Sequence, residues 1–197
     1  MNDRRRRFTR DELESFRDST VPDLVGPGCR LLFVGINPGL WTAATQTHFA
    51  HPGNRFYPAL LRGGVIRRPI DPASGMDDDE RQHLIDLGIG ITNIAPRATA
   101  RAAELDRSEL RAGARDLSDR IAQWTPQVVA IAGITAYRVG FDRPRAQAGR
   151  QADQLAGAEV WIVPNPSGLN AHETITTLAS AYRRVARAAG LDVVGDT

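Results

Sequence analysis

Four short apolar runs along the chain predict four buried strands. Each run is mainly aliphatic and is bounded by polar or turn-forming residues, a pattern typical of strands covered on both faces. We expect these strands at residues 30–35, 90–94, 127–132 and 160–163.

Helical signals lie between and outside these runs. Thr9 and Asp77 each stand three residues before a glutamate, and these capping boxes predict the starts of two helices. We expect a long loop over residues 38–53, a short helix over residues 54–62 and a longer helix that begins at Ser108. A final helix is expected to begin with Asn170 as its cap.

The order of these elements predicts an α/β protein. Strands that alternate with helices pair in parallel, which gives a three-layer α/β/α sandwich with a central, mainly parallel sheet of about four strands. We divide the chain into a basic N-terminal arm with a short helix, residues 1–20, and one domain, residues 21–197. A chain of 197 residues is long enough for one substantial core.

Composition excludes several kinds of chemistry. Cys29 is the only cysteine, which rules out an intrachain disulfide and a cysteine-ligated iron–sulfur cluster or zinc site. The chain has no lysine, so neither a Schiff base nor a Walker lysine is available. We expect no metal and no organic cofactor.

Charge and hydropathy limit the partners. The net charge of +2 and the pI of about 9.2 allow a polyanionic partner without requiring one. No apolar run approaches the roughly 18 residues that span a bilayer, and no apolar stretch follows Arg4–Arg7. We therefore expect a cytoplasmic monomer with no membrane partner.

The most informative segment is Gly35-Ile36-Asn37-Pro38-Gly39, which follows the first predicted strand. Ligands bind at the carboxyl ends of strands in open α/β sheets, so this turn presents the Asn37 amide where a site is expected. The amide has two interpretations. It is a turn former that bonds its own backbone, or it holds a water by donating and accepting at once.

A second segment, residues 49–57, places an aromatic residue in a polar loop. Phe49 is a candidate to stack on a planar ligand such as a nucleobase, with the backbone at Phe49 and Ala50 binding the edge of that base. His51 is either an acid–base group or a structural histidine. Asn54 either caps the following helix or binds the base, and the sequence alone favours neither role.

A third segment follows the last predicted strand and consists of Asn165, Pro166, Ser167, Gly168, Leu169 and Asn170. Leu169 is an apolar side chain among turn-forming residues. It is either a staple onto the next helix or a wedge that enters a base stack and fills vacated space. The N–H groups of residues 170–173 are a candidate phosphate site, although Glu173 would compete for them.

Together these segments resemble the mismatch-specific uracil/thymine DNA glycosylases of the uracil-DNA glycosylase superfamily. The matching stretches are residues 35–40, 49–56, 90–93 and 164–169, and their order and spacing fit over roughly residues 26 to 187. The resemblance implies a uracil-DNA glycosylase-like fold and double-stranded DNA with a mismatched or modified base as partner. It also implies hydrolysis of the N-glycosidic bond of uracil, chiefly opposite G, to leave an abasic site.

The resemblance further implies roles for individual residues. Asn37 would orient the attacking water in a monofunctional reaction, and Phe49 would stack on the extruded base. Other groups expected at the base are Gly35, Ile36, Ala50 and Asn54. Gly168 and Leu169 would penetrate the duplex and contact the widowed guanine, with Asn165, Ser167 and Asn170 beside them. Asn37 and Asn165 replace an aspartate and a histidine of other uracil glycosylases, so slow catalysis is expected.

A few positions depart from the relatives. Trp41 and Thr42 replace small residues, and both are expected beside the pocket together with Pro38, Gly39 and His51. Asn170 and Ala171 stand where relatives have a serine and an arginine, and Tyr57 replaces a tryptophan. These changes bear on which bases are accepted, including thymine and other deaminated bases.

Two other functions are open at this stage. An α/β enzyme acting on a free nucleotide or nucleoside would use the same cleft, but it predicts a glycine-rich phosphate loop or a lysine, and neither is present. A non-catalytic DNA-binding module would use Arg4–Arg7 for salt-dependent affinity to any duplex.

Overall fold

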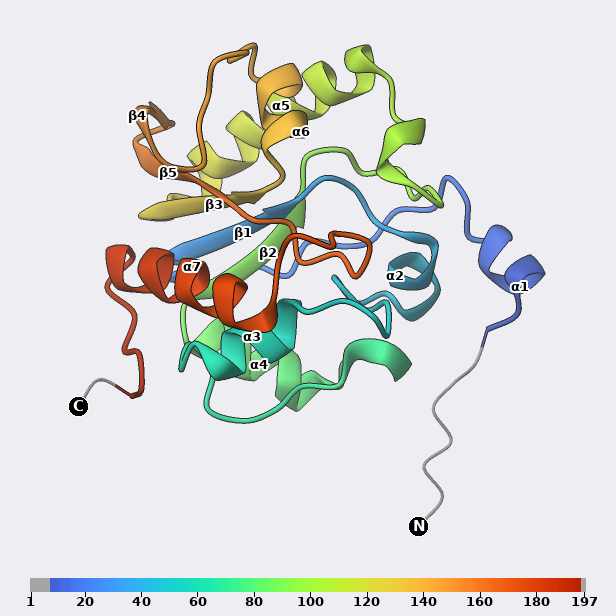
Figure 1. The fold of residues 1–197 in the computed structure, drawn as a ribbon, viewed down its shortest axis with the longest axis horizontal. Helices are drawn as coiled ribbons and strands as arrows, with labels where there is room; N and C mark the ends of the chain where they lie inside the picture. The colour runs from blue at the N-terminus through green and yellow to red at the C-terminus, as the bar shows by residue number, and fades with distance from the viewer. Residues whose placement is uncertain (1–7, 196–197) are drawn as a thin grey trace.

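The computed structural model describes residues 8–195, which form one five-stranded sheet between two layers of helices (Figure 1). The strand order is β2-β1-β3-β5-β4, and all neighbouring strands except β4 and β5 are parallel. The strands are β1 (Leu31–Gly35), β2 (Ile89–Asn93), β3 (Val128–Ala132), β4 (Gly149–Leu155) and β5 (Ala158–Val163). The α/β fold class and the four predicted strands are confirmed.

The fifth strand, β4, was not predicted, and its composition explains why. It lies at the edge of the sheet, antiparallel to β5, and most of its residues are polar and exposed. An edge strand needs no apolar run, because neither face of it has to be buried.

Alternate residues of β1 pack against opposite helical layers. Leu31 and Phe33 face a core formed with α3 (Phe56–Arg62), α4 (Asp78–Asp86) and α7 (Ile175–Ala188). Leu32 and Val34 face a second core formed with α5 (Arg107–Trp124) and α6 (Ile134–Gly140). Figure 1 shows these two groups of helices on opposite faces of the sheet. No helix among residues 8–195 has both the length and the apolar character needed to cross a membrane.

Several predicted helix boundaries were wrong. The expected loop over residues 38–53 contains α2 (Leu40–Thr45), whose six residues are too few to show a helical period. The helix α6 was also not predicted, and α5 begins after Asp106 rather than at Ser108. Two short 3₁₀ turns complete the described elements, Pro72–Ser74 and Ala102–Glu104.

The start of α7 is the correction that matters most for the site. Asn170 is not its cap, because Thr174 and Thr177 form the capping box and the helix begins at Ile175. The Asn170 side chain instead accepts a bond from the His172 N–H and donates to the Asn165 carbonyl. The predicted phosphate site at residues 170–173 therefore lies in a loop rather than at a helix N-terminus.

The N-terminal segment packs beside the sheet's carboxyl edge. Helix α1 (Arg10–Glu14) begins with the expected capping box of Thr9 and Glu12. Leu13 and Phe16 pack on Leu40 of α2, so the segment that follows the basic residues contacts the helix next to the Asn37 turn. The residues Arg4–Arg7 lie outside the described residues.

Candidate active site

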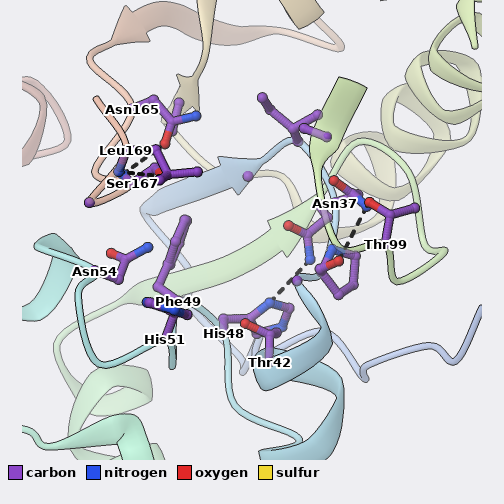
Figure 2. A pocket seen from close by; sticks show the side chains of 18 of the residues that line it. Asn37, Thr42, His48, Phe49, His51, Asn54, Thr99, Asn165, Ser167 and Leu169 are labelled. Carbon is purple, nitrogen blue, oxygen red and sulfur yellow. Dashed lines mark hydrogen bonds between the residues drawn. The ribbon is translucent and has the colours of Figure 1, made fainter. Parts of the chain in front are cut away.

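A cavity of about 490 Å³ opens at the carboxyl ends of β1, β2 and β3 (Figure 2). All three segments selected from the sequence contribute to its wall, through residues within 35–39, 49–54 and 165–169. No aspartate, glutamate or arginine is among the described residues that line it. Its amide side chains are those of Asn37, Asn54, Asn93 and Asn165. The cavity thus combines a largely apolar wall with several amide groups, and no carboxylate or guanidinium group of the described residues lines it.

The orientation of the Asn37 amide is fixed by its neighbours. Asn37 Nδ2 donates to the Arg97 carbonyl and to Thr99 Oγ1, both at 2.8 Å, and to the Pro38 carbonyl at 3.2 Å. Carbonyl oxygens only accept, so the NH₂ group must face them. Asn37 Oδ1 makes no hydrogen bond to the described residues and is left as an acceptor at the cavity.

Phe49 lines the cavity in an unusual backbone conformation. Its φ is +56°, a region that aromatic residues rarely adopt. One ring face stacks on Phe56, with centroids 4.2 Å apart and an interplanar angle of 26°. Strain of this kind persists only where the surroundings enforce it, and it is concentrated at functional sites.

Asn54 and His51 each have one polar atom committed to the local turn. Asn54 Oδ1 accepts from the Phe56 N–H at 2.9 Å, which leaves its NH₂ group without a partner among the described residues. His51 Nδ1 accepts from the Gly53 N–H at 3.0 Å, and the ring is exposed at the cavity rim. The two interpretations of Asn54 are compatible, since one atom shapes the helix start and the other is available at the cavity.

The β5–α7 loop, residues 164–174, forms the opposite wall. Asn165 Oδ1 accepts from the Ser167 N–H at 3.0 Å, so the Asn165 NH₂ group remains available. Leu169 lines the cavity mouth and is 89% exposed, the most exposed large apolar side chain of the described residues. Figure 2 shows Asn37 and Thr99 across the cavity from Ser167 and Leu169, with Phe49 below them. The loop therefore projects an apolar tip into solvent at the mouth of the cavity.

A buried histidine supports the cavity from behind. His48 Nε2 lies 2.9 Å from the Pro22 carbonyl, and Nδ1 lies 3.2 Å from Asn93 Nδ2. Burial lowers the His48 pKa, so the ring is neutral at pH 7. A neutral ring that donates from Nε2 must accept at Nδ1, which points Asn93 Oδ1 away from His48. A side chain at Gly35 would lie 2.4 Å from that Oδ1, so glycine is required there.

A comparison with known protein families identifies the family. A model of the uracil DNA glycosylase superfamily matches residues 22–187. The chain belongs to this superfamily. Among solved structures, it is similar to the solution NMR structure of a Methanosarcina acetivorans protein provisionally named as a uracil DNA glycosylase. The TM-score is 0.57 at 15% sequence identity, over 84% of this chain and 96% of that chain, a likeness that shows the fold alone.

Most residues predicted for the site line this superfamily member's cavity, and three do not. Ala50 is fully buried, and Asn170 faces its own loop through the bond to Asn165. Trp41 lies behind the wall, where its Nε1–H donates to the Ala73 carbonyl at 2.9 Å. Thr42 does line the cavity and is buried.

The sequence interpretation did not assign His48, Asn93 or Thr99 to the site. Asn93 had a usable signal, because it lies near the end of the strand predicted at residues 90–94, which pairs with the strand that precedes Asn37. Thr99 is held next to the Asn37 turn by the bond from its N–H to the Pro38 carbonyl at 3.1 Å. Nothing local in the sequence marks that contact or the approach of His48.

Among the described residues, no group of three or more histidine, cysteine, aspartate or glutamate side chains is placed to hold a metal ion. The titratable side chains at the cavity are His48 and His51. Besides these two histidines, the polar side chains at the cavity are amides and hydroxyls.

Proposed function

We propose that this protein is a monofunctional, mismatch-specific uracil-DNA glycosylase. It hydrolyses the N-glycosidic bond of uracil in duplex DNA, chiefly opposite G, and leaves an abasic site. The observation that supports this most directly is the convergence of Asn37, Phe49 and Leu169 on one uncharged cavity. An orienting amide, a stacking ring and an apolar tip are the groups that hydrolysis of an extruded base requires.

Asn37 orients the hydrolytic water. Its NH₂ group is already committed to Arg97, Thr99 and Pro38, so Oδ1 accepts a hydrogen bond from the water and thereby directs a lone pair of the water oxygen at the sugar. The departing sugar resembles an oxocarbenium ion, so the water needs orientation more than deprotonation. An amide in place of a charged group loses an electrostatic contribution of about 10²–10³ in rate, which makes the enzyme slow.

Backbone groups and an amide side chain bind the leaving base. Phe49, backed by Phe56, stacks on the ring of the extruded base, and the backbone near Phe49 and Ala50 binds its edge. The Asn165 NH₂ group is available to donate to the developing base anion, because Asn165 Oδ1 is committed to the Ser167 N–H. Thr42 lines the cavity and reduces the space available for the base. Thymine, with its extra methyl group, is therefore a poorer substrate than uracil.

Mismatch preference follows from slow chemistry. A base must leave the stack before it reaches Asn37, and a uracil opposite G is extruded at lower cost than one in a normal pair. Leu169 enters the vacated space and delays the return of the base. A weak catalyst therefore acts mainly on bases that stay extruded.

The deciding experiment measures excision from oligonucleotides with a single uracil, by alkaline cleavage of the abasic product. We expect the highest rate for uracil opposite G, a lower rate opposite A, and no strand cleavage before alkali treatment. Equal rates opposite G, opposite A and in single strands would contradict mismatch specificity. Binding without excision would identify a non-catalytic module instead.

A further inference from the structure

The Arg55 side chain, which lies outside the β5–α7 loop, donates hydrogen bonds to three carbonyl groups of that loop. Arg55, which immediately precedes α3, donates from Nη1 to the Glu173 carbonyl and from Nη2 to the Ser167 carbonyl. Nη2 also donates to the Asn170 carbonyl at 2.8 Å. One guanidinium group thus bonds three points of a loop that lies more than a hundred residues away in the sequence.

The backbones of the two segments are also in contact. The Arg55 N–H donates to the Pro166 carbonyl at 3.0 Å. A Cβ on Gly168 would lie 2.6 Å from the Gly53 carbonyl oxygen, so the loop approaches residues 53–55 as closely as a glycine allows. Residues 53–55 and the β5–α7 loop are therefore in direct backbone contact.

The geometry of the Arg55 guanidinium group suits it to binding several carbonyl groups of the loop at once. Its guanidinium donors spread in a fixed fork, which a lysine ammonium cannot reproduce. Its Nε is buried and has no hydrogen-bond partner among the described residues, so this position of the side chain costs free energy. Arg55 makes no hydrogen bond to Asn37 or Thr99, and it is not among the described residues that line the cavity.

We propose that Arg55 is a positioning residue that fixes the β5–α7 loop and thereby the exposed tip Leu169, and that it acts on extrusion of the base rather than on bond cleavage. The proposal rests on the glycosylase function proposed above. It follows that loss of Arg55 impairs excision only where a base has to be pushed out of a duplex. A base that is already extruded does not need the tip.

The first test compares Arg55→Met with Arg62→Met, a control at the exposed far end of the same helix. Single-turnover excision is measured on a G·U duplex, on a single strand with one uracil, and on a duplex with a pyrene nucleotide opposite the uracil. We expect Arg55→Met to be slower by about tenfold or more on the G·U duplex, and by less than about twofold on the single strand. The pyrene group fills the vacated space itself, so it should restore excision.

Equal losses on the duplex and the single strand, or no loss on either, would overturn the role of Arg55. Leu169→Ala should show the same pattern as Arg55→Met, because both changes remove the tip from its position. Arg62→Met should match the unmodified protein on all three substrates.

A second test does not depend on activity. Hydrogen exchange without DNA should be faster at the amides of residues 167–174 in Arg55→Met, and also in Arg55→Lys, than in Arg62→Met. Unchanged exchange there would refute the proposal even if excision falls. If the unmodified protein excises no uracil, the proposed function is wrong, whereas the exchange result still decides whether Arg55 holds the loop.

Discussion

The Asn37 amide is oriented by Thr99, whose Oγ1 lies 2.8 Å from Asn37 Nδ2. Thr99 Oγ1 donates to the Arg101 carbonyl at 2.9 Å, so its lone pairs are the groups that face Asn37. The hydroxyl therefore selects the amide rotamer in which Oδ1 is presented to the cavity. Under the proposed mechanism, Thr99 therefore affects the orientation of the water through Asn37 and not through a side-chain contact with the water.

Thr99→Val keeps the shape of the side chain but removes this acceptor. We expect kcat on a G·U duplex to fall by about tenfold, since one hydrogen bond that orients Asn37 is lost, with no change in the Kd for DNA. Thr99→Ser should restore the rate because it retains the hydroxyl. An unchanged rate in Thr99→Val would show that this hydrogen bond is not needed to orient Asn37.

Asn37→Ala should bind DNA normally and lose excision by about 10²–10³. Asn37→Asp is more informative, because a carboxylate oxygen would face the Arg97 and Pro38 carbonyl oxygens at 2.8 and 3.2 Å. Repulsion raises the pKa of such a carboxyl group. We therefore expect Asn37→Asp to be slower than the unmodified enzyme at pH 7.5, measured by single-turnover excision. A faster Asn37→Asp enzyme would show that this pocket accommodates a charged base.

The sequence predicted the parts of the site that are local. Asn37 and Phe49 were found because each lies in a turn next to an apolar element, where periodicity and turn chemistry give a signal. Thr99, His48 and Arg55 were not assigned roles, since each acts through contacts between segments distant in the sequence. Such contacts depend on strand order, which the chain shows only once folded.

The helix boundaries illustrate the same limit. Asn170 matches a cap in residue type, yet Thr174 caps α7 because Asn170 is drawn into bonds with Asn165 and His172. The sequence indicates which residues are able to cap a helix. The tertiary contacts of the loop determine which of these residues caps α7.

His48 predicts a pH dependence of stability. Burial lowers its pKa in the folded protein below the value of about 6.5 expected in the unfolded chain. Below pH 6.5 the unfolded state therefore binds more protons, and the free energy of unfolding falls as the pH falls, by up to about 1.4 kcal/mol per pH unit. In His48→Gln, chemical denaturation between pH 7.5 and 5 should show a smaller decrease. His83, whose pKa burial also lowers, is present in both proteins and cancels in the comparison.

The same residue predicts a pH dependence of excision. A protonated His48 donates from Nδ1 and no longer accepts from Asn93 Nδ2, so the Asn93 amide turns and Oδ1 leaves its place beside Gly35. Single-turnover excision from a G·U duplex should fall with decreasing pH in the unmodified enzyme and fall less in His48→Gln. Identical pH profiles for the two proteins would show that protonation of His48 does not affect excision.

The basic residues Arg4–Arg7 predict that DNA binding beside the cavity depends on the salt concentration. Phe8 packs edge-to-face on Trp41 at 5.0 Å, Trp41 contacts His51 at 5.9 Å, and His51 lines the cavity rim. The chain therefore enters its described part next to the expected DNA-binding face. Replacing Arg6 and Arg7 by serine should make the slope of log Kd against log salt shallower by up to about 1.8, because each lost phosphate contact changes it by about 0.9. Replacing Arg62 and Arg67 removes the same charge from an exposed surface at and beyond the far end of α3 and should leave the slope unchanged, so equal slopes for the two double variants would assign the effect to net charge alone.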